Sequence, residues 1–171
     1  MKKLAILAFA LLAAMPAAAQ SGALKLSLWD HIAIATPANT QEIKGLDFGI
    51  GSKSATVTGV QLDLLFAQTE YELRGVSMAW IINLANDVYG VQSALLTKAE
   101  NLNGAQLGFV NMSNHSATGV QFGLFNQAEY IHGAQIGFVN YAKTIEGLQI
   151  GILNIAENGW FPAMVLVNGR F

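Results

Sequence analysis

The stretch from Gly104 to Ala156 contains one ten-residue motif four times, as GAQLGFVNMS (104–113), GVQFGLFNQA (119–128), GAQIGFVNYA (133–142) and GLQIGILNIA (147–156). Fainter copies precede it, and all of them align on an opening glycine. The opening glycines are spaced 14 to 16 residues apart; they are Gly45, Gly59, Gly75, Gly90, Gly104, Gly119, Gly133 and Gly147. Chance does not produce eight such copies, so the chain is built on an internal repeat.

Each copy alternates apolar and polar residues after its opening glycine, which we number position one. Position three is Gln in most copies, position five is small except at Asp63, and an Asn often follows near position eight with an Ala two residues later. A period of two predicts strands, and two glycines per copy argue against helix. Apolar residues flank the opening glycine three places apart, so we expect that glycine to mark a corner where the strand changes phase.

These columns predict an all-β fold, namely a parallel β-solenoid or β-roll of about eight coils of 14–16 residues. Equivalent residues of successive coils then stack about 4.8 Å apart. Stacked Gln and Asn side chains can form amide ladders, and we expect the apolar columns to form the core. Ile136 lies in one of these columns, so replacing it by Asp is expected to unfold or truncate the array.

A small antiparallel outer-membrane β-barrel is the alternative. Residues 163–171 alternate and end in Phe171, as the last strand of such barrels does, and the apolar residues of 148–152 alternate with Gln149 and Gly151. Against the barrel, each copy offers only three apolar residues for an apolar band of about 25 Å. Successive strands of such a barrel are joined alternately by short turns and long loops, and the copies do not show this alternation. Identical residues also recur at the same position of each copy, as expected if equivalent residues of successive coils stack on one another. The solenoid is therefore favoured.

The first residues predict export. Lys2 and Lys3 precede an apolar run over 4–15, and Ala17-Ala18-Ala19 gives the small-x-small pattern that signal peptidase recognises. We therefore expect a signal peptide over residues 1–19, and a location in the periplasm, at the cell surface or in the outer membrane.

The rest of the chain divides into three parts. We expect an N-terminal strand or cap at 20–44, the repeat array at 45–158 and a C-terminal capping strand at 159–171. Within the first part, the pattern predicts one or two strands broken near Asp30 and a loop at 36–40.

The composition narrows the classes of partner. Only 12% of the 171 residues are charged, against roughly 25% in an ordinary soluble domain, while 53% are hydrophobic. Loss of Lys2 and Lys3 with the leader takes the formal net charge from −2 to −4. A mildly acidic chain without a basic patch argues against a nucleic-acid partner, and a chain without Cys has no disulfide framework.

The phrase G-L-Q-I-G-I-L-N-I-A at 147–156, followed by Asn158-Gly159-Trp160-Phe161-Pro162, resembles a family of bacterial surface-repeat proteins of unassigned function. The resemblance covers about residues 26–171; it implies export and a repeat array, and no catalytic residues. The unit alone also resembles the head repeat of trimeric autotransporter adhesins, in which a fourteen-residue unit builds a left-handed parallel β-roll.

No catalytic, cofactor-binding or metal site is predicted. His115 and His132 fall in different positions of their copies and His31 lies outside the array, so the three His do not converge as metal ligands must. Glu70 and Glu72 share one face of a strand, which is ordinary for a solvated surface. The segment 49–54, GIGSKS, lacks the spacing of a phosphate-binding loop. No cofactor is expected.

The position-six column leaves two interpretations open. It contains Ile50, Leu64, Leu95, Phe109, Leu124, Phe138 and Ile152. Positions six and seven can straddle a corner and both turn inward. Alternatively, position six points outward and forms a long apolar stripe for self-association or envelope contact, larger than a monomer ordinarily exposes.

The sequence thus predicts an exported, non-enzymatic repeat protein with a surface-structural or binding role. The alternative, tied to the alternative fold, is a small outer-membrane β-barrel protein.

Overall fold

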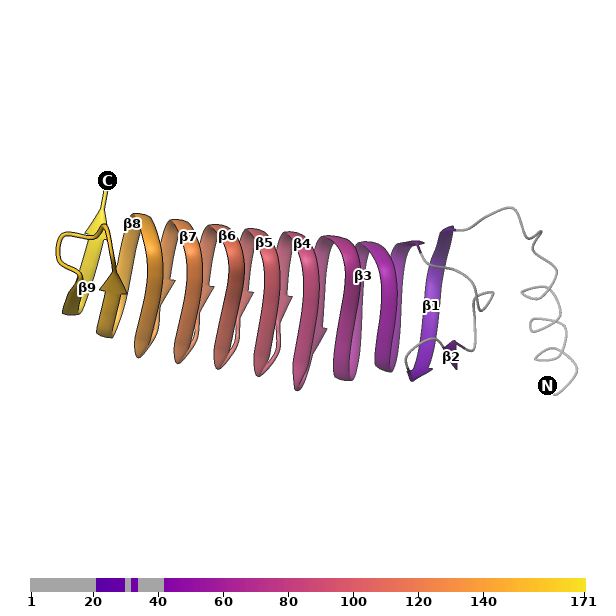
Figure 1. The fold of residues 1–171 in the computed structure, drawn as a ribbon. Helices are drawn as coiled ribbons and strands as arrows, with labels where there is room; N and C mark the ends of the chain where they lie inside the picture. The colour runs from indigo at the N-terminus through magenta and orange to yellow at the C-terminus, as the bar shows by residue number, and fades with distance from the viewer. Residues whose placement is uncertain (1–20, 30–31, 34–41) are drawn as a thin grey trace, which may run out of the picture.

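The computed structural model describes residues 21–29, 32–33 and 42–171, and among these there is no helix. The strands are β1 (Ser21–Trp29), β2 (Ile32–Ala33), β3 (Glu42–Ala79), β4 (Ile82–Ser93), β5 (Leu96–Leu107), β6 (Val110–Phe122), β7 (Phe125–Ile136), β8 (Val139–Ala156) and β9 (Ala163–Arg170). They form a single sheet in the order β2-β1-β3-β4-β5-β6-β7-β8-β9, which winds into a rod of stacked coils (Figure 1).

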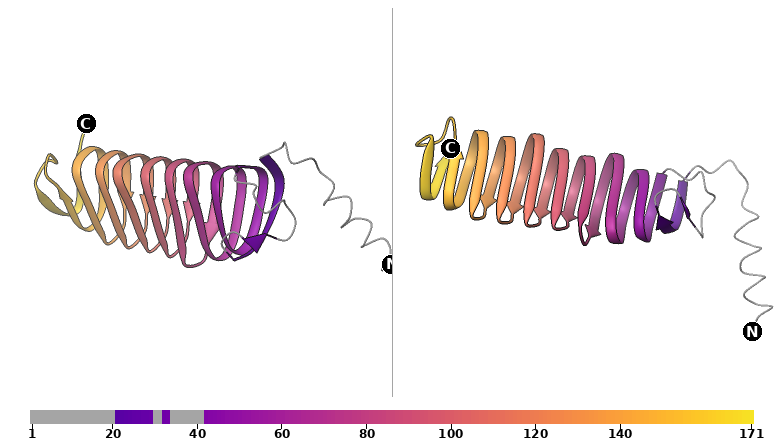
Figure 2. Two further views of the ribbon diagram at one scale, coloured as in Figure 1. Left: turned by 45° about the vertical axis from the view of Figure 1, so that its right-hand side comes forward. Right: turned by 60° about the horizontal axis from the view of Figure 1, so that its bottom comes forward.

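Successive copies pair in parallel from β3 to β8, in register from the opening glycine to position four, with register shifts elsewhere between β3 and β4, β5 and β6, and β6 and β7. Gly119 lies beside Gly133, and Gln121 beside Gln135, because each copy stacks on the equivalent residues of the next. Figure 2 shows the same stack from two further directions. The predicted parallel β-solenoid is confirmed. The antiparallel barrel is wrong, because strands adjacent in the array run in the same direction and the edge strands β2 and β9 are not paired with each other.

Antiparallel strands lie at both ends of this sheet. β2 pairs with β1, which itself pairs in parallel with the start of β3, and β9 pairs with β8. Such terminal strands shield the open sheet edge of a solenoid, which would otherwise template aggregation. β1 and β2 match the strands predicted on either side of Asp30. The predicted signal peptide, Asp30 itself and the predicted loop at 36–40 lie outside the described residues.

The opening glycines stack in one column and share an unusual backbone conformation. Their φ angles lie between 128° and 144°, a region that disfavours residues with a Cβ. A Cβ on Gly133 would lie 2.1 Å from the carbonyl oxygen of Gly119. The predicted phase change is wrong, however: Ile131 points inward and Ala134 outward, as in an uninterrupted strand. The glycine is required for close stacking rather than for a change of face.

Two apolar columns form the core, and both are thin. One is the residue two places before each opening glycine; the other is the Ala column. Their buried members are Ile43, Val57, Leu73, Val88, Leu102, Ala117, Ile131 and Ile145, together with Ala85, Ala99, Ala128, Ala142 and Ala156. Small alanines facing larger aliphatic side chains let the two walls of the coil approach closely.

The Gln column fills the other part of the interior, as an amide ladder. From Gln106 to Gln149, each side-chain Nε2 in the column donates to the Oε1 of the Gln in the preceding coil, at 2.8 Å from Gln121 to Gln106 and 2.7 Å from Gln135 to Gln121. Each Nε2 also donates to a backbone carbonyl of its own coil, such as Tyr141 O at 3.1 Å from Gln135. The predicted Gln ladder is confirmed, and it gives hydrogen-bond partners to side chains that are 0% exposed, except for Gln149 Oε1 at its end, which has none among the described residues.

The Asn column forms a second ladder. Asn126 Nδ2 donates to Asn140 Oδ1 at 2.8 Å, and Asn140 Nδ2 donates to Asn154 Oδ1 at 2.7 Å. Thr97, a departure from the column in sequence, joins it through a hydroxyl that donates to Asn111 Oδ1 at 2.7 Å. The ladder therefore continues through a residue that cannot form an amide pair.

The structure overturns one part of the predicted core. Ile136 and the other position-four residues point outward, and Gln135 points inward, so Ile136→Asp does not place a charge in the core. Alternate residues of a strand face opposite sides, so Gln and its apolar neighbours cannot both be buried. The interior takes the Gln because stacked amides satisfy one another and because position three is in phase with the aliphatic core column.

Candidate functional site

Each coil bends sharply after position four, and the side chains before and after the bend point outward. We call the resulting surface the apolar edge. It is made of Phe48, Ile50, Leu62, Leu64, Met78, Trp80, Leu95, Leu107, Phe109, Phe122, Leu124, Ile136, Phe138, Ile150 and Ile152, most of them exposed. Phe109 and Phe138 are each 57% exposed and Trp80 is 76% exposed. Of the two interpretations of position six, the structure thus supports the outward one.

A groove runs along the apolar edge over the last coils. Its walls are position-four and position-six side chains such as Phe122 and Phe138, and its floor is the position-five glycine column. Leu166 and Val167 of β9 continue the wall at the end of the stack. The groove has a volume of about 700 Å³ and an overwhelmingly apolar lining.

The glycine floor follows from the Asn ladder beneath it. A Cβ on Gly137 would lie 2.2 Å from Gly123 O and 2.6 Å from Asn126 Nδ2. That amide also donates to Ile136 O at 3.0 Å and so fixes the backbone at the bend. The buried ladder thus excludes side chains from position five and leaves a channel between the two apolar ridges.

Charged residues are confined to the rest of the surface. No outward-facing residue between positions two and seven of the eight copies is Asp, Glu, Lys or Arg. On the opposite side, charges of both signs pair between neighbouring coils: Lys143 Nζ lies 3.1 Å from Glu129 Oε1. The glutamate raises the pKa of Lys143, chiefly through this hydrogen bond. The solenoid therefore has an uncharged edge and a charge-paired face.

His115 and His132 lie on the charge-paired face and do not contact each other. His115 Nδ1 lies 3.0 Å from Glu100 and His132 Nδ1 lies 3.1 Å from Glu146, each across one coil boundary. His31 is outside the described part of the chain. Within that part, no three potential ligands among His, Cys, Asp and Glu come together in a group that would hold a metal ion.

Glu70 and Glu72 also have separate partners. Glu70 Oε1 lies 2.8 Å from Lys53 Nζ, whereas Glu72 binds the Arg74 guanidinium. The hydrogen bond from Arg74 holds the pKa of Glu72 below its ordinary value. The two carboxylates are therefore part of the charged surface, and they do not form an acid–base pair.

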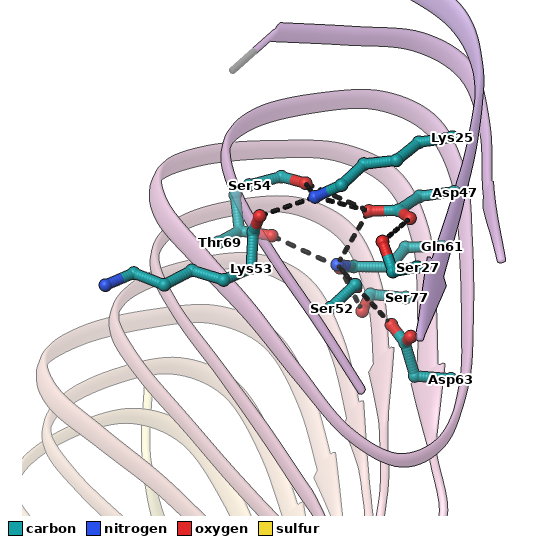
Figure 3. Close-up of polar contacts among 10 residues, drawn as sticks. All are labelled: Lys25, Ser27, Asp47, Ser52, Lys53, Ser54, Gln61, Asp63, Thr69 and Ser77. Atoms are coloured by element: carbon teal, nitrogen blue, oxygen red, sulfur yellow. Dashed lines mark hydrogen bonds and ion pairs between the residues drawn. The ribbon is translucent and has the colours of Figure 1, made fainter. Parts of the chain in front are cut away.

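A buried polar cluster, which was not predicted from the sequence, occupies the core of the first coils. Figure 3 shows its side chains converging from β1 and β3. Its members, none more than 6% exposed, are Lys25, Ser27, Asp47, Ser52, Ser54, Gln61, Asp63, Thr69 and Ser77. Two signals were present in the sequence: Asp47 interrupts the Gln column and Asp63 interrupts the small column. The GIGSKS segment supplies Ser52 and Ser54 to this core, so it is no phosphate loop.

The centre of the cluster is a buried ion pair surrounded by hydroxyl groups. Lys25 Nζ lies 3.9 Å from Asp47 Oδ2 and donates to Ser54 Oγ at 2.8 Å, and Ser54 Oγ in turn donates to Asp47 Oδ2 at 2.9 Å. Ser27 Oγ donates to the other Asp47 oxygen at 3.4 Å. A buried ion pair with such supporting hydrogen bonds offsets much of its desolvation cost. The arrangement fills the core at the start of the rod, where the Gln ladder ends.

Asp63 is the unusual member of the cluster. Burial raises its pKa to about 7; the hydrogen bond from Ser52 Oγ, 2.5 Å long, lowers it, the charge of Asp47 raises it, and the charge of Lys25 lowers it. Asp63 Oδ1 has no hydrogen-bond partner among the described residues. Protonation of this carboxyl removes the cost of an unpaired buried charge.

We expect Asp63 to make the protein less stable as the pH rises from about 4 to about 7. In that window the folded protein keeps the proton while the unfolded chain, with an Asp pKa of 3.8, releases it, so stability is lost. The loss amounts to about 4 kcal/mol at and above pH 7, because the pKa rises from 3.8 to about 7 and each pKa unit corresponds to about 1.36 kcal/mol. Urea unfolding of wild type and Asp63→Asn across pH 4 to 8 measures it as the difference between the two profiles.

The control for this titration is Asp87→Asn. Asp87 lies outside the cluster and accepts a hydrogen bond from Asn101 at an exposed site, so this variant keeps the contribution of Asp63 and should still lose stability between pH 4 and 7. Parallel profiles for wild type and Asp63→Asn would instead show that Asp63 ionises normally in the folded state.

Comparison with family models, curated proteins and solved structures gives no match to this chain. In the described ranges, no helix has both the length and the apolar character needed to cross a bilayer.

Proposed function

We propose that this chain is an exported, non-enzymatic repeat protein of the bacterial envelope, with a surface-structural or binding role that it performs through the apolar edge. The observation that carries the proposal is the segregation of the surface into an uncharged apolar edge and a charge-paired face. Export is supported by the predicted signal peptide, and the absence of enzymatic activity by the separate positions of His115 and His132, each of which pairs with a glutamate.

The size of the apolar edge supports a binding role. Each aromatic side chain of the edge has a full surface area of about 150–250 Å², and most side chains of the edge expose around half of their area. The exposed apolar surface of the edge is therefore on the order of 1,000 Å². The largest apolar patch of an ordinary monomer is about 300–600 Å². The rod gains nothing in stability from exposing this surface, because its core columns and ladders are complete without it. A partner that covers the edge accounts for its composition.

The proposal is tested by placing charges on the edge without disturbing the core. We expect Phe109→Asp/Phe138→Asp to keep the circular dichroism spectrum and melting temperature of wild type, because both side chains are more than half exposed. In cells expressing the protein, the variant should move at least tenfold from the envelope fraction to the soluble periplasmic or secreted fraction.

Tyr130→Asp is the matched control. Tyr130 is similarly exposed, at 51%, but lies on the charge-paired face near Lys143. It should fractionate as wild type does. Equal fractionation of all three proteins would refute a binding role for the edge.

A further inference from the structure

We infer that the apolar edge binds the surface of a lipid layer, with its two side-chain ridges inserted at the boundary between headgroups and acyl chains. The inference rests on the proposed function and names the partner of the same surface. A second copy of this chain is the competing occupant, and three features of the edge favour lipid.

The first feature is shape. Position-four side chains such as Phe122 lie before the bend and position-six side chains such as Leu124 lie after it, so the edge wraps a corner of every coil. A stable protein interface buries about 800 Å² on each partner at well-fitted surfaces. Two rigid copies, each with ridges on both sides of a groove, would touch mainly at the ridges and leave much of their apolar surface in water. Lipid deforms around both the ridges and the groove and covers them.

The second feature is the absence of charge along the whole edge together with an exposed Trp. Trp80 projects from position six and is the most exposed member of the edge, at 76%. Trp is enriched where proteins meet the membrane interface, because its ring is apolar and its N–H is polar. A polar rim, as protein interfaces ordinarily have, is missing between positions two and seven.

The third feature is the end of the groove. Leu166 has a φ of 69°, which is strained for a bulky residue, and it is 71% exposed. Its side chain nevertheless lines the groove beside Val167. Backbone strain that keeps a leucine on an apolar surface fits a surface that is covered when the protein functions. The glycine-floored channel leading from it offers an acyl segment contact on both sides.

The charge distribution predicts how this binding responds to salt. Lys143 and His132 are paired with glutamates on the far side of the rod, and no basic cluster borders the edge in the part of the chain that the structure describes. Insertion of apolar side chains about 5–10 Å deep, without a basic face, does not require anionic lipid. Binding should therefore occur on zwitterionic membranes and persist in salt.

The experiment is sedimentation of the purified protein with vesicles of phosphatidylcholine alone, at 0.05 and 0.5 M NaCl. We expect cosedimentation that changes less than twofold between the two salt concentrations, and a blue shift of tryptophan emission. Phe109→Asp/Phe138→Asp should weaken binding at least tenfold, whereas Tyr130→Asp should bind as wild type does. Phe109→Ser/Phe138→Ser, which adds no charge, provides a second edge variant if the first does not fold.

The outcomes separate this inference from the proposed function. If vesicles do not bind but the protein self-associates in analytical ultracentrifugation and edge variants are monomeric, the lipid inference is wrong and a binding edge remains. Binding confined to anionic vesicles and lost in 0.5 M NaCl would also overturn it. If edge variants match wild type in vesicle binding, self-association and cell fractionation, both proposals are wrong.

Discussion

Replacing Gly133 by Ala should lower the free energy of unfolding by roughly 3 kcal/mol or more. The new Cβ would lie 2.1 Å from Gly119 O and 2.9 Å from its carbonyl carbon, both of them backbone atoms that cannot rotate away. The residue would also be held at a φ of 140°, which alone costs about 1–3 kcal/mol for a residue with a side chain. Because each coil stacks on its neighbour, relief requires two coils to separate and break their shared hydrogen bonds.

Thermal and urea unfolding measure this effect. At about 2–4 °C per kcal/mol for a chain of this size, the melting temperature should fall by about 6–12 °C. The control is Ala134→Val, which enlarges the next residue by two carbons at an outward-facing position where other copies, such as the one containing Val120, already carry Val. It should change stability by less than about 0.5 kcal/mol. A Gly133→Ala variant as stable as this control would contradict the close stacking.

Replacing Gln135 by Leu should cost about 3 kcal/mol, although it makes the interior more apolar. Gln135 Nε2 donates to Gln121 Oε1 at 2.7 Å, and Gln135 Oε1 accepts from Gln149 Nε2 at 2.8 Å. Leu removes both bonds, as well as the bond from Gln135 Nε2 to Tyr141 O, and leaves the Gln121 oxygen buried without this donor. Each orphaned buried group costs about 1–3 kcal/mol. Urea unfolding of the purified variant measures the loss.

Gln127→Leu makes the same chemical change on the outer surface. The Gln127 side chain lies at the surface, and only its backbone carbonyl is engaged by the ladder, through Gln121 Nε2 at 3.0 Å. We expect its stability to stay within about 0.5 kcal/mol of wild type. If Gln135→Leu were as stable as Gln127→Leu, the amide ladder would contribute no net stability and hydrophobic contact alone would hold the coils together.

Much of the fold could be predicted because residues that recur at a fixed spacing indicate which positions of successive coils stack on one another. Identical residues recurring every 14–16 positions, with Gln121 and Gln135 as an example, are sufficient to infer parallel coils and amide ladders. The candidate binding surface was predicted only as one of two interpretations of position six, since the identity of Phe138 does not say which way it points.

The buried polar cluster could not be predicted with the same rule. Asp47 and Asp63 were visible as departures from their columns, but a departure does not reveal a partner. Lys25 lies outside the array and meets Asp47 only because β1 stacks on the start of β3. The contact joins two residues that are 22 positions apart in the sequence, and no local pattern around Lys25 indicates it.

The sequence by itself determined the architecture. Copies of one repeat motif, each beginning with a glycine, can stack as parallel coils, and this stacking places equivalent residues side by side. Only the tertiary structure decided which side of each strand is the inside. A period of two is satisfied equally well with Gln135 or Ile136 buried, because both choices alternate. The inward side was chosen by the narrow space between the coil walls, where amides can bond from coil to coil along the axis, and that choice put the phenylalanines and isoleucines of the repeat on the surface.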